Sequence, residues 1–113
     1  MPRNHKIYLK DILNSIDEIL NYTKDITVFD DYNSDIKTMR AVERNLEIIG
    51  EAVKKIPDSI KKEHQNIDWR KIAGLRDVLI HGYSDIDNEI IWEVIHEKIP
   101  KLRIHIQNIL TIE

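Results

Sequence analysis

The sequence predicts an all-α fold, an up-and-down bundle of four to five helices in a single domain spanning residues 1–113. Apolar residues recur at steps of three and four along most of the chain, which is the helical period. No segment shows the apolar–polar alternation that is typical of a half-buried strand. Only three Gly and three Pro are present, and this leaves few turns for an all-β sandwich or barrel.

The first predicted helix runs from about Asn4 to about Ile26. Its opposite face is charged or polar, as expected for a helix that lies on a core. The apolar stripe consists of Leu9, Ile12, Leu13, Ile16, Ile19 and Leu20. We expect the helix to end before residues 30–34, because that segment (Asp-Asp-Tyr-Asn-Ser) is rich in turn formers.

The second predicted helix begins near Ser34, which is a good N-cap residue, and ends before Pro57. Its long one-sided stripe consists of Ile36, Met39, Val42, Leu46, Ile49, Val53 and Ile56. Gly50 lies inside this helix, where Gly costs about 1 kcal/mol relative to Ala. It indicates either the close approach of another backbone or simple sequence drift.

A short helical turn over Asp58 to Gln65 precedes the third long helix, which is expected from Trp69 to about Ile80 with Asp68 as its N-cap. Its buried face consists of Ile72, Leu75 and Leu79. Gly82 marks the expected end of this helix or a distortion in it.

Capping oxygens from Asp85, Asp87 and Asn88 precede the last predicted helix. Its stripe consists of Ile90, Ile91, Val94, Ile95, Ile99, Leu102, Ile106, Ile109 and Leu110. Pro100 interrupts the stripe, so we expect a kink or a split into two helices.

Composition excludes several classes of protein. With 42% hydrophobic and 33% charged residues the chain is not a disordered one. The absence of Cys rules out a disulfide framework and thiolate metal sites, and the five His show no metal-ligand spacing, so no metal or cofactor is expected. No apolar run suits a membrane span and no signal-peptide core begins the chain, which favours a cytoplasmic protein. The net charge of −3 argues by itself against a constitutive nucleic-acid binder.

One octapeptide, Arg76 to Tyr83, gathers a permanent cation, a carboxylate, an imidazole and a phenol. If the helix persists, Asp77 and His81 share a face, and Asp77 can orient the imidazole or raise its basicity. Arg76 and His81 are five residues apart, roughly 140° around an ideal helix. Their side chains therefore converge only if the arginine extends or the helix distorts near Gly82.

An arginine and a histidine without a metal suit RNA cleavage by the 2′-hydroxyl. His81 can transfer a proton near neutral pH, and Arg76 can clamp phosphate oxygens. Efficient transfer needs both a base and an acid, and a symmetric homodimer would supply the second histidine. From spacing alone a structural interpretation stays open, in which Arg76 pairs with a carboxylate and His81 caps a helix end.

The same residues carry a family resemblance. Residues 76–83 resemble the Arg-x4-His-x-Tyr signature of HEPN-domain proteins of the HepT-like toxin subfamily. Residues 44–52, with the internal Gly50, are similar to the family's second-helix block, and residues 67–75 resemble the segment before its signature. Trp92, followed by Ile-Pro-Lys-Leu at residues 99–102, resembles its final helix, so the likeness spans nearly the whole chain.

The resemblance implies a homodimeric HEPN bundle that acts as a metal-independent ribonuclease, the toxin of a toxin–antitoxin pair. It implies that Arg76 and His81 are catalytic across the dimer cleft, with Asp77 supporting them. The antitoxin of such pairs is a minimal nucleotidyltransferase, which would transfer AMP to Tyr83. That modification would add negative charge and bulk two residues from His81.

The distribution of charge answers the objection from net acidity. Residues 54–76 carry seven Lys or Arg against three Asp or Glu, whereas both ends of the chain are acidic. We expect RNA contacts from four of these residues, namely Lys54, Lys55, Arg70 and Lys71. Two other functions stay open: a non-catalytic nucleotide-binding or regulatory partner of a nucleotidyltransferase, and a helical dimerisation protein without chemistry.

Overall fold

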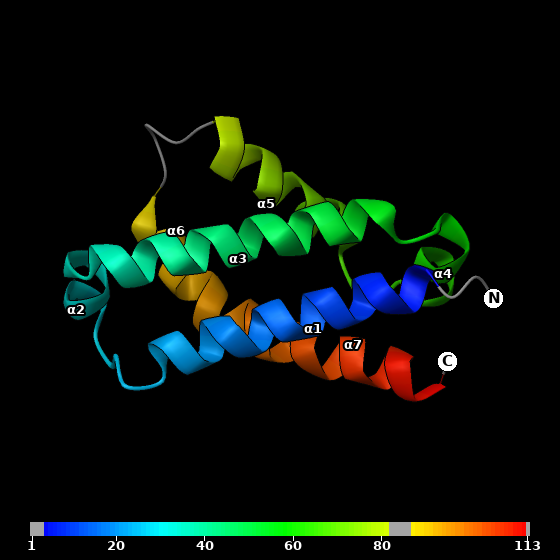
Figure 1. Cartoon of the computed structure of the whole chain (residues 1–113), viewed down its shortest axis with the longest axis horizontal. Helices are drawn as coiled ribbons and strands as arrows, with labels where there is room; N and C mark the ends of the chain where they lie inside the picture. Colours follow the sequence, from blue (N-terminus) through cyan, green and yellow to red (C-terminus); the bar gives the residue numbers. More distant parts are fainter. Residues whose placement is uncertain (1–3, 82–86, 113) are drawn as a thin grey trace.

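Two antiparallel helices, α1 (Asn4–Thr23) and α3 (Ile36–Lys55), form the centre of the structure, a computed structural model that describes residues 4–81 and 87–112. They lie side by side along the long axis of the molecule (Figure 1). The predicted stripe of α1 is buried at Leu9, Ile12, Ile16 and Ile19, and that of α3 at Val42, Leu46, Ile49 and Val53. Helical periodicity therefore identified the inward faces of both helices, except at Ile36, which is the first residue of α3 and is exposed, so its place in the predicted stripe was wrong.

The first helix is shorter than predicted, because it ends at Thr23 and not near Ile26. The Thr23 hydroxyl donates a hydrogen bond to the Ile19 carbonyl (2.8 Å). The Ile26 amide donates to the Thr23 carbonyl (3.0 Å), which closes a turn after the last helical residue. Ile26 lies in this turn and packs partly against the core. The predicted helix was too long because an apolar residue in a turn looks the same in the sequence as one in a helix.

The segment predicted as a turn forms a short helix, α2 (Phe29–Ser34). The Tyr32 side chain of this helix is fully buried, and the centroid of its ring lies 5.3 Å from that of the Trp92 ring. Burial raises the pKa of the Tyr32 hydroxyl well above its usual value. The turn prediction was wrong here because aromatic packing stabilises a helix that the local residue preferences do not favour.

The N-cap of α3 is Asp35 and not the predicted Ser34, whose hydroxyl instead donates to the Asp31 carbonyl inside α2. The Asp35 carboxylate accepts hydrogen bonds from the Thr38 amide (3.1 Å) and the Thr38 hydroxyl (2.7 Å). Both bonds lower the pKa of the Asp35 carboxyl, and the bond from the hydroxyl has the larger effect. Asp at this position satisfies an amide that has no partner within the helix.

The next boundaries agree with the sequence prediction. Helix α3 ends at Lys55, and Ile56 is extended (φ −71°, ψ 130°), as expected of a residue before proline. A short helix, α4 (Asp58–Glu63), occupies the predicted helical turn. Helix α5 (Trp69–His81) then begins after Asp68, whose carboxylate accepts a hydrogen bond from the Lys71 amide (3.2 Å).

The last helical run has three parts: α6 (Asn88–Glu93), the π-helical segment η2 (Val94–Lys98) and α7 (Ile99–Ile112). Asp87 caps it as predicted, since its carboxylate accepts from the Glu89 amide (2.9 Å). The expected split near Pro100 takes the form of the π turn, in which the Ile99 amide bonds to the Val94 carbonyl. Widening the helix there relieves the contact between the proline ring and the preceding turn. Gly82 and Asp85 lie outside the described residues.

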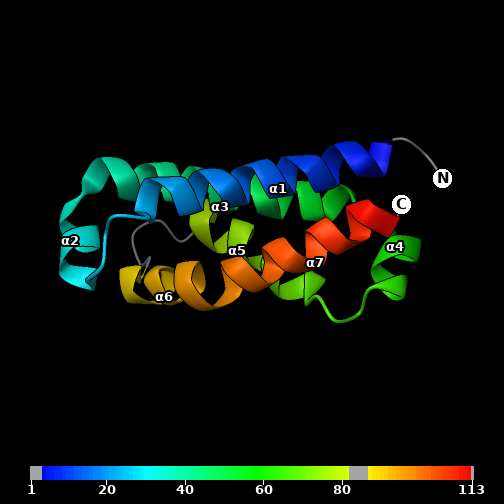
Figure 2. The same cartoon turned by 90° about the horizontal axis from the view of Figure 1, so that it is seen from below.

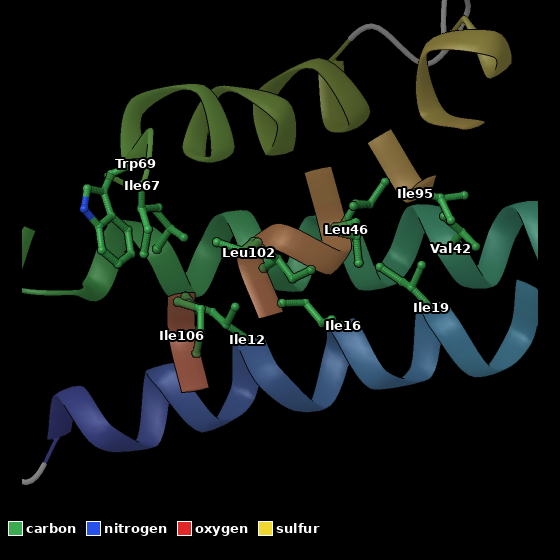
Figure 3. Close-up of a cluster of buried hydrophobic side chains, with 14 of the residues drawn as sticks. Ile12, Ile16, Ile19, Val42, Leu46, Ile67, Trp69, Ile95, Leu102 and Ile106 are labelled. Carbon is green, nitrogen blue, oxygen red and sulfur yellow. The ribbon is translucent and has the colours of Figure 1, made fainter. Parts of the chain in front are cut away.

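The long elements alternate in direction, so the up-and-down arrangement is confirmed (Figures 1 and 2). Helix α1 packs on α3 and α7, whereas α5 makes its extensive contacts with α3. Side chains from α1, α3 and the last helical run meet in one core, shown in Figure 3 for Ile16, Leu46 and Leu102 among others. Across residues 4–81 and 87–112 there is no strand, and no helix is long and apolar enough to cross a membrane.

Candidate functional site

Arg76 lies at a close contact between α5 and α3. The facing residue on α3 is Gly50, and a Cβ built on Gly50 would lie 3.2 Å from the Arg76 Cα and nearer still to its Cβ. Carbon atoms in van der Waals contact are about 3.5–4.0 Å apart, so no larger residue fits without moving α5. Of the two interpretations of Gly50, the structure supports the close approach of another backbone.

The Arg76 side chain is packed at its base and open at its tip. Its Nε atom is buried, yet the side chain as a whole is 28% exposed. Nη2 of Arg76 lies 3.7 Å from Oε1 of Glu51, the residue after Gly50 on α3. One turn of α3 therefore contacts both the backbone and the guanidinium of Arg76. The guanidinium has further N–H groups beyond the one that faces Glu51, and such groups can bind the oxygens of a phosphate.

The other residues of the predicted signature are described less fully. Asp77 and His81 belong to α5, which stays helical through His81, while their side chains are outside the described part of the chain. The Cα of His81 therefore lies about 7.5 Å further along the helix axis than that of Arg76. Tyr83 lies outside the described residues altogether.

The four predicted RNA contacts do not gather at one point. Lys54 lies one turn after Gly50 on α3, near the crossing with α5. The Lys55 ammonium instead lies 5.5 Å from the Tyr8 ring on α1. Arg70 and Lys71 occupy the first turn of α5, and Lys71 forms an exposed ion pair with Asp68 (3.8 Å). Their role in binding RNA stays a prediction.

A groove of about 380 Å³ opens on the side of α5 that faces α7. Its apolar lining includes Leu46 and Ile49 from α3 and Ile72 and Leu75 from α5, so two residues of the predicted buried face of α5 border this groove. Basic residues along it are Lys71, Lys98, Lys101 and His105. Sequence reasoning singled out only the first of these as functional.

The sequence already contains a signal for the other basic residues of this groove. Lys98, Lys101 and His105 are spaced by three and four residues, which places them on one face of the last helical run. Glu51 gave no such signal, because its pairing with Arg76 depends on the crossing of two helices that are distant in sequence. No group of three or more potential metal-binding side chains occurs among the described residues.

Comparisons with known proteins agree on one family. Residues 12–109 match the family model described as ribonuclease HepT-like. A protein of Thermococcus cleftensis named "Probable ribonuclease HepT" is 47% identical over 91% of this chain and 93% of its own length. Proteins with RNase names from Methanocaldococcus jannaschii (43% identical, 88% of this chain, 83% of theirs) and Caldanaerobacter subterraneus (42%, 91% and 91%) are also similar. No solved structure matches the chain.

Proposed function

The chain belongs to the ribonuclease HepT-like family, and from this membership we propose that it is a metal-independent endoribonuclease whose catalytic residues are Arg76 and His81. The observation that best supports the proposal is the placement of Arg76, whose base is packed against Gly50 while its charged tip is partly exposed beside Glu51. A preorganised cation of this kind stabilises charge that develops on a phosphate in the transition state.

The proposed reaction is attack of an RNA 2′-hydroxyl oxygen on the adjacent phosphorus. A histidine removes the proton of the 2′-hydroxyl, and a second acid gives a proton to the leaving 5′-oxygen. The products are a 2′,3′-cyclic phosphate and a free 5′-hydroxyl. Arg76 binds the non-bridging oxygens during the transfer, and Asp77 supports the imidazole of His81 from the preceding turn of α5.

A homodimer completes the site in this proposal. Each protomer contributes one Arg76 and one His81, and a two-fold axis brings the two sets together so that one imidazole serves as base and the other as acid. Light scattering on the purified protein tests this step, because a monomer that still cleaves RNA at full rate would contradict it.

We further propose that the protein is the toxin of a toxin–antitoxin pair. Its partner would be a minimal nucleotidyltransferase that transfers AMP to Tyr83, blocking the phosphate site beside Arg76 by charge and bulk. The expected result for Tyr83→Phe is RNA cleavage at the wild-type rate that the nucleotidyltransferase and ATP no longer suppress. Suppression of that variant to the same extent as the wild type would exclude Tyr83 as the target.

The central experiment compares wild-type protein with His81→Ala on a short single-stranded RNA in the presence of EDTA. We expect cleavage by the wild type, with product 3′ ends that carry a cyclic phosphate, and no cleavage by His81→Ala. His64→Ala is the matched control, since His64 follows α4 and lies far from α5's last turn in sequence. Equal cleavage by His81→Ala and wild type would refute the assignment, and nucleotide binding without cleavage would favour a regulatory partner of a nucleotidyltransferase.

A further inference from the structure

Glu51 forms an ion pair with Arg76, and it is the residue after the glycine that lets Arg76 approach α3. Successive residues on a helix point about 100° apart. Gly50 therefore faces α5, while Glu51 lies at the edge of the contact, where the arginine tip emerges. We propose that Glu51 is a positioning residue that holds the Arg76 guanidinium in its reactive orientation. This inference rests on the proposed ribonuclease function.

The exposure of the pair indicates that its main contribution is not to stability. The Glu51 side chain is 41% exposed and that of Arg76 28% exposed, and ion pairs of this kind contribute little to folding. An arginine side chain has many rotamers, however, and each contact of its guanidinium reduces the number that it samples. A carboxylate within 3.7 Å narrows that range before substrate arrives. Orientation that is set in advance lowers the barrier of the chemical step.

Glu51 could affect the reaction by positioning Arg76 or only through its negative charge, and the two roles predict different effects on kcat and KM. Glu51 places a negative charge beside the site that is proposed to receive phosphate, so removing it favours binding of the RNA polyanion. Removing it also takes away one contact that restrains the guanidinium, which slows the chemical step. A positioning role thus predicts a lower kcat without a higher KM. A role through charge alone predicts a lower KM with kcat unchanged, and a purely structural role predicts losses only in proportion to the unfolded fraction.

The test measures kcat and KM on a short single-stranded RNA for wild type, Glu51→Ala and Glu51→Gln. We expect kcat to fall about 10- to 100-fold in Glu51→Ala, with KM equal or lower. Glu51→Gln should be intermediate, because its amide oxygen keeps a partial negative charge facing the guanidinium and can accept a hydrogen bond from it. The matched control is Glu47→Ala, which removes the same charge one turn earlier on α3 and breaks an ion pair with Arg44 (3.1 Å) instead. Unchanged kcat in Glu51→Ala, or an equal loss in Glu47→Ala, would overturn the proposal.

A second measurement separates this inference from the proposed function. The NMR order parameter of the Arg76 Nε–H bond, measured without RNA, reports how far this bond moves on the picosecond-to-nanosecond timescale, and therefore how tightly the guanidinium is held. We expect it to be lower in Glu51→Ala than in the wild type and in Glu47→Ala. If the wild type fails to cleave RNA while this difference is present, the ribonuclease proposal fails and the positioning contact stands. If the order parameter is the same in all three proteins, Glu51 does not position Arg76.

Discussion

Replacing Gly50 with alanine tests whether the crossing of α3 and α5 controls Arg76. In a helix interior the change gains about 1 kcal/mol of helix propensity. The new methyl group would lie 3.2 Å from the Arg76 Cα and 3.1 Å from its Cγ, so α5 has to move away from α3. Because the Arg76 Cβ is nearer still, a shift of about 1.5–2 Å is needed to restore ordinary contact distances. Overpacking of this kind costs about 1–3 kcal/mol, so the net expectation is a destabilisation of up to about 2 kcal/mol.

The same shift moves the arginine relative to the rest of the site. Misplacing a reacting group by about 1 Å can slow a reaction about 100-fold, and we expect a loss of RNA cleavage of about 10- to 100-fold in Gly50→Ala. Gly74 on α5 provides the matched control, because a Cβ built there meets no described atom within 4 Å. Gly74→Ala should raise stability by up to about 1 kcal/mol and leave cleavage unchanged.

Urea unfolding and single-turnover cleavage of a short RNA measure both effects in the same proteins. The reasoning is refuted if Gly50→Ala is as stable as Gly74→Ala and cleaves RNA at the wild-type rate. In that case the close contact between the two helices would be unrelated to the placement of Arg76.

Three further predictions concern other parts of the molecule. Ile16→Ala removes a fully buried side chain of α1 and should lower the free energy of unfolding by about 2–5 kcal/mol in urea titrations. The lowered pKa of Asp35 means that its cap stabilises the fold above about pH 4 and that this contribution is lost as the pH falls through the folded-state pKa. Asp35→Asn, which can still cap α3, should therefore lose less stability than the wild type between pH 5 and pH 2 in thermal unfolding, and equal losses would contradict this. Lys71→Glu should weaken RNA binding and flatten its salt dependence, whereas an unchanged slope would remove this lysine from the RNA interface.

Periodicity and capping residues were sufficient to predict most of the fold. The stripe of α1, that of α3 apart from the exposed Ile36, the cap at Asp68 and the helix end before Pro57 follow from local chemistry. All of these are present in the structure. Helix α2 was missed because its stability depends on a long-range contact between Tyr32 and Trp92. Local preferences carry no information about such partners.

In the candidate site, too, some residues could be predicted from the sequence and others could not. Arg76 and His81 could be named from their spacing on one helix and from the family signature, and Gly50 could be flagged because glycine is costly inside a helix. Glu51 could not be assigned a role, because nothing local links it to an arginine 25 positions later in the chain. That link follows from the antiparallel crossing of α3 and α5, which is a property of the folded molecule.

The π turn before Pro100 determines where the last helical run can lose a residue. The buried residues Ile91, Ile95 and Ile99 are four apart, and in a regular α-helix each such step overshoots a full turn by about 40°. The wider turn of η2 removes this 40° excess, so η2 is equivalent to an α-helix with one inserted residue. Deleting Glu97 would return the segment to a regular α-helix and leave the phase of α7 intact. Deleting Asn108 within α7 would instead rotate every later residue by about 100° and turn Ile109 away from the core.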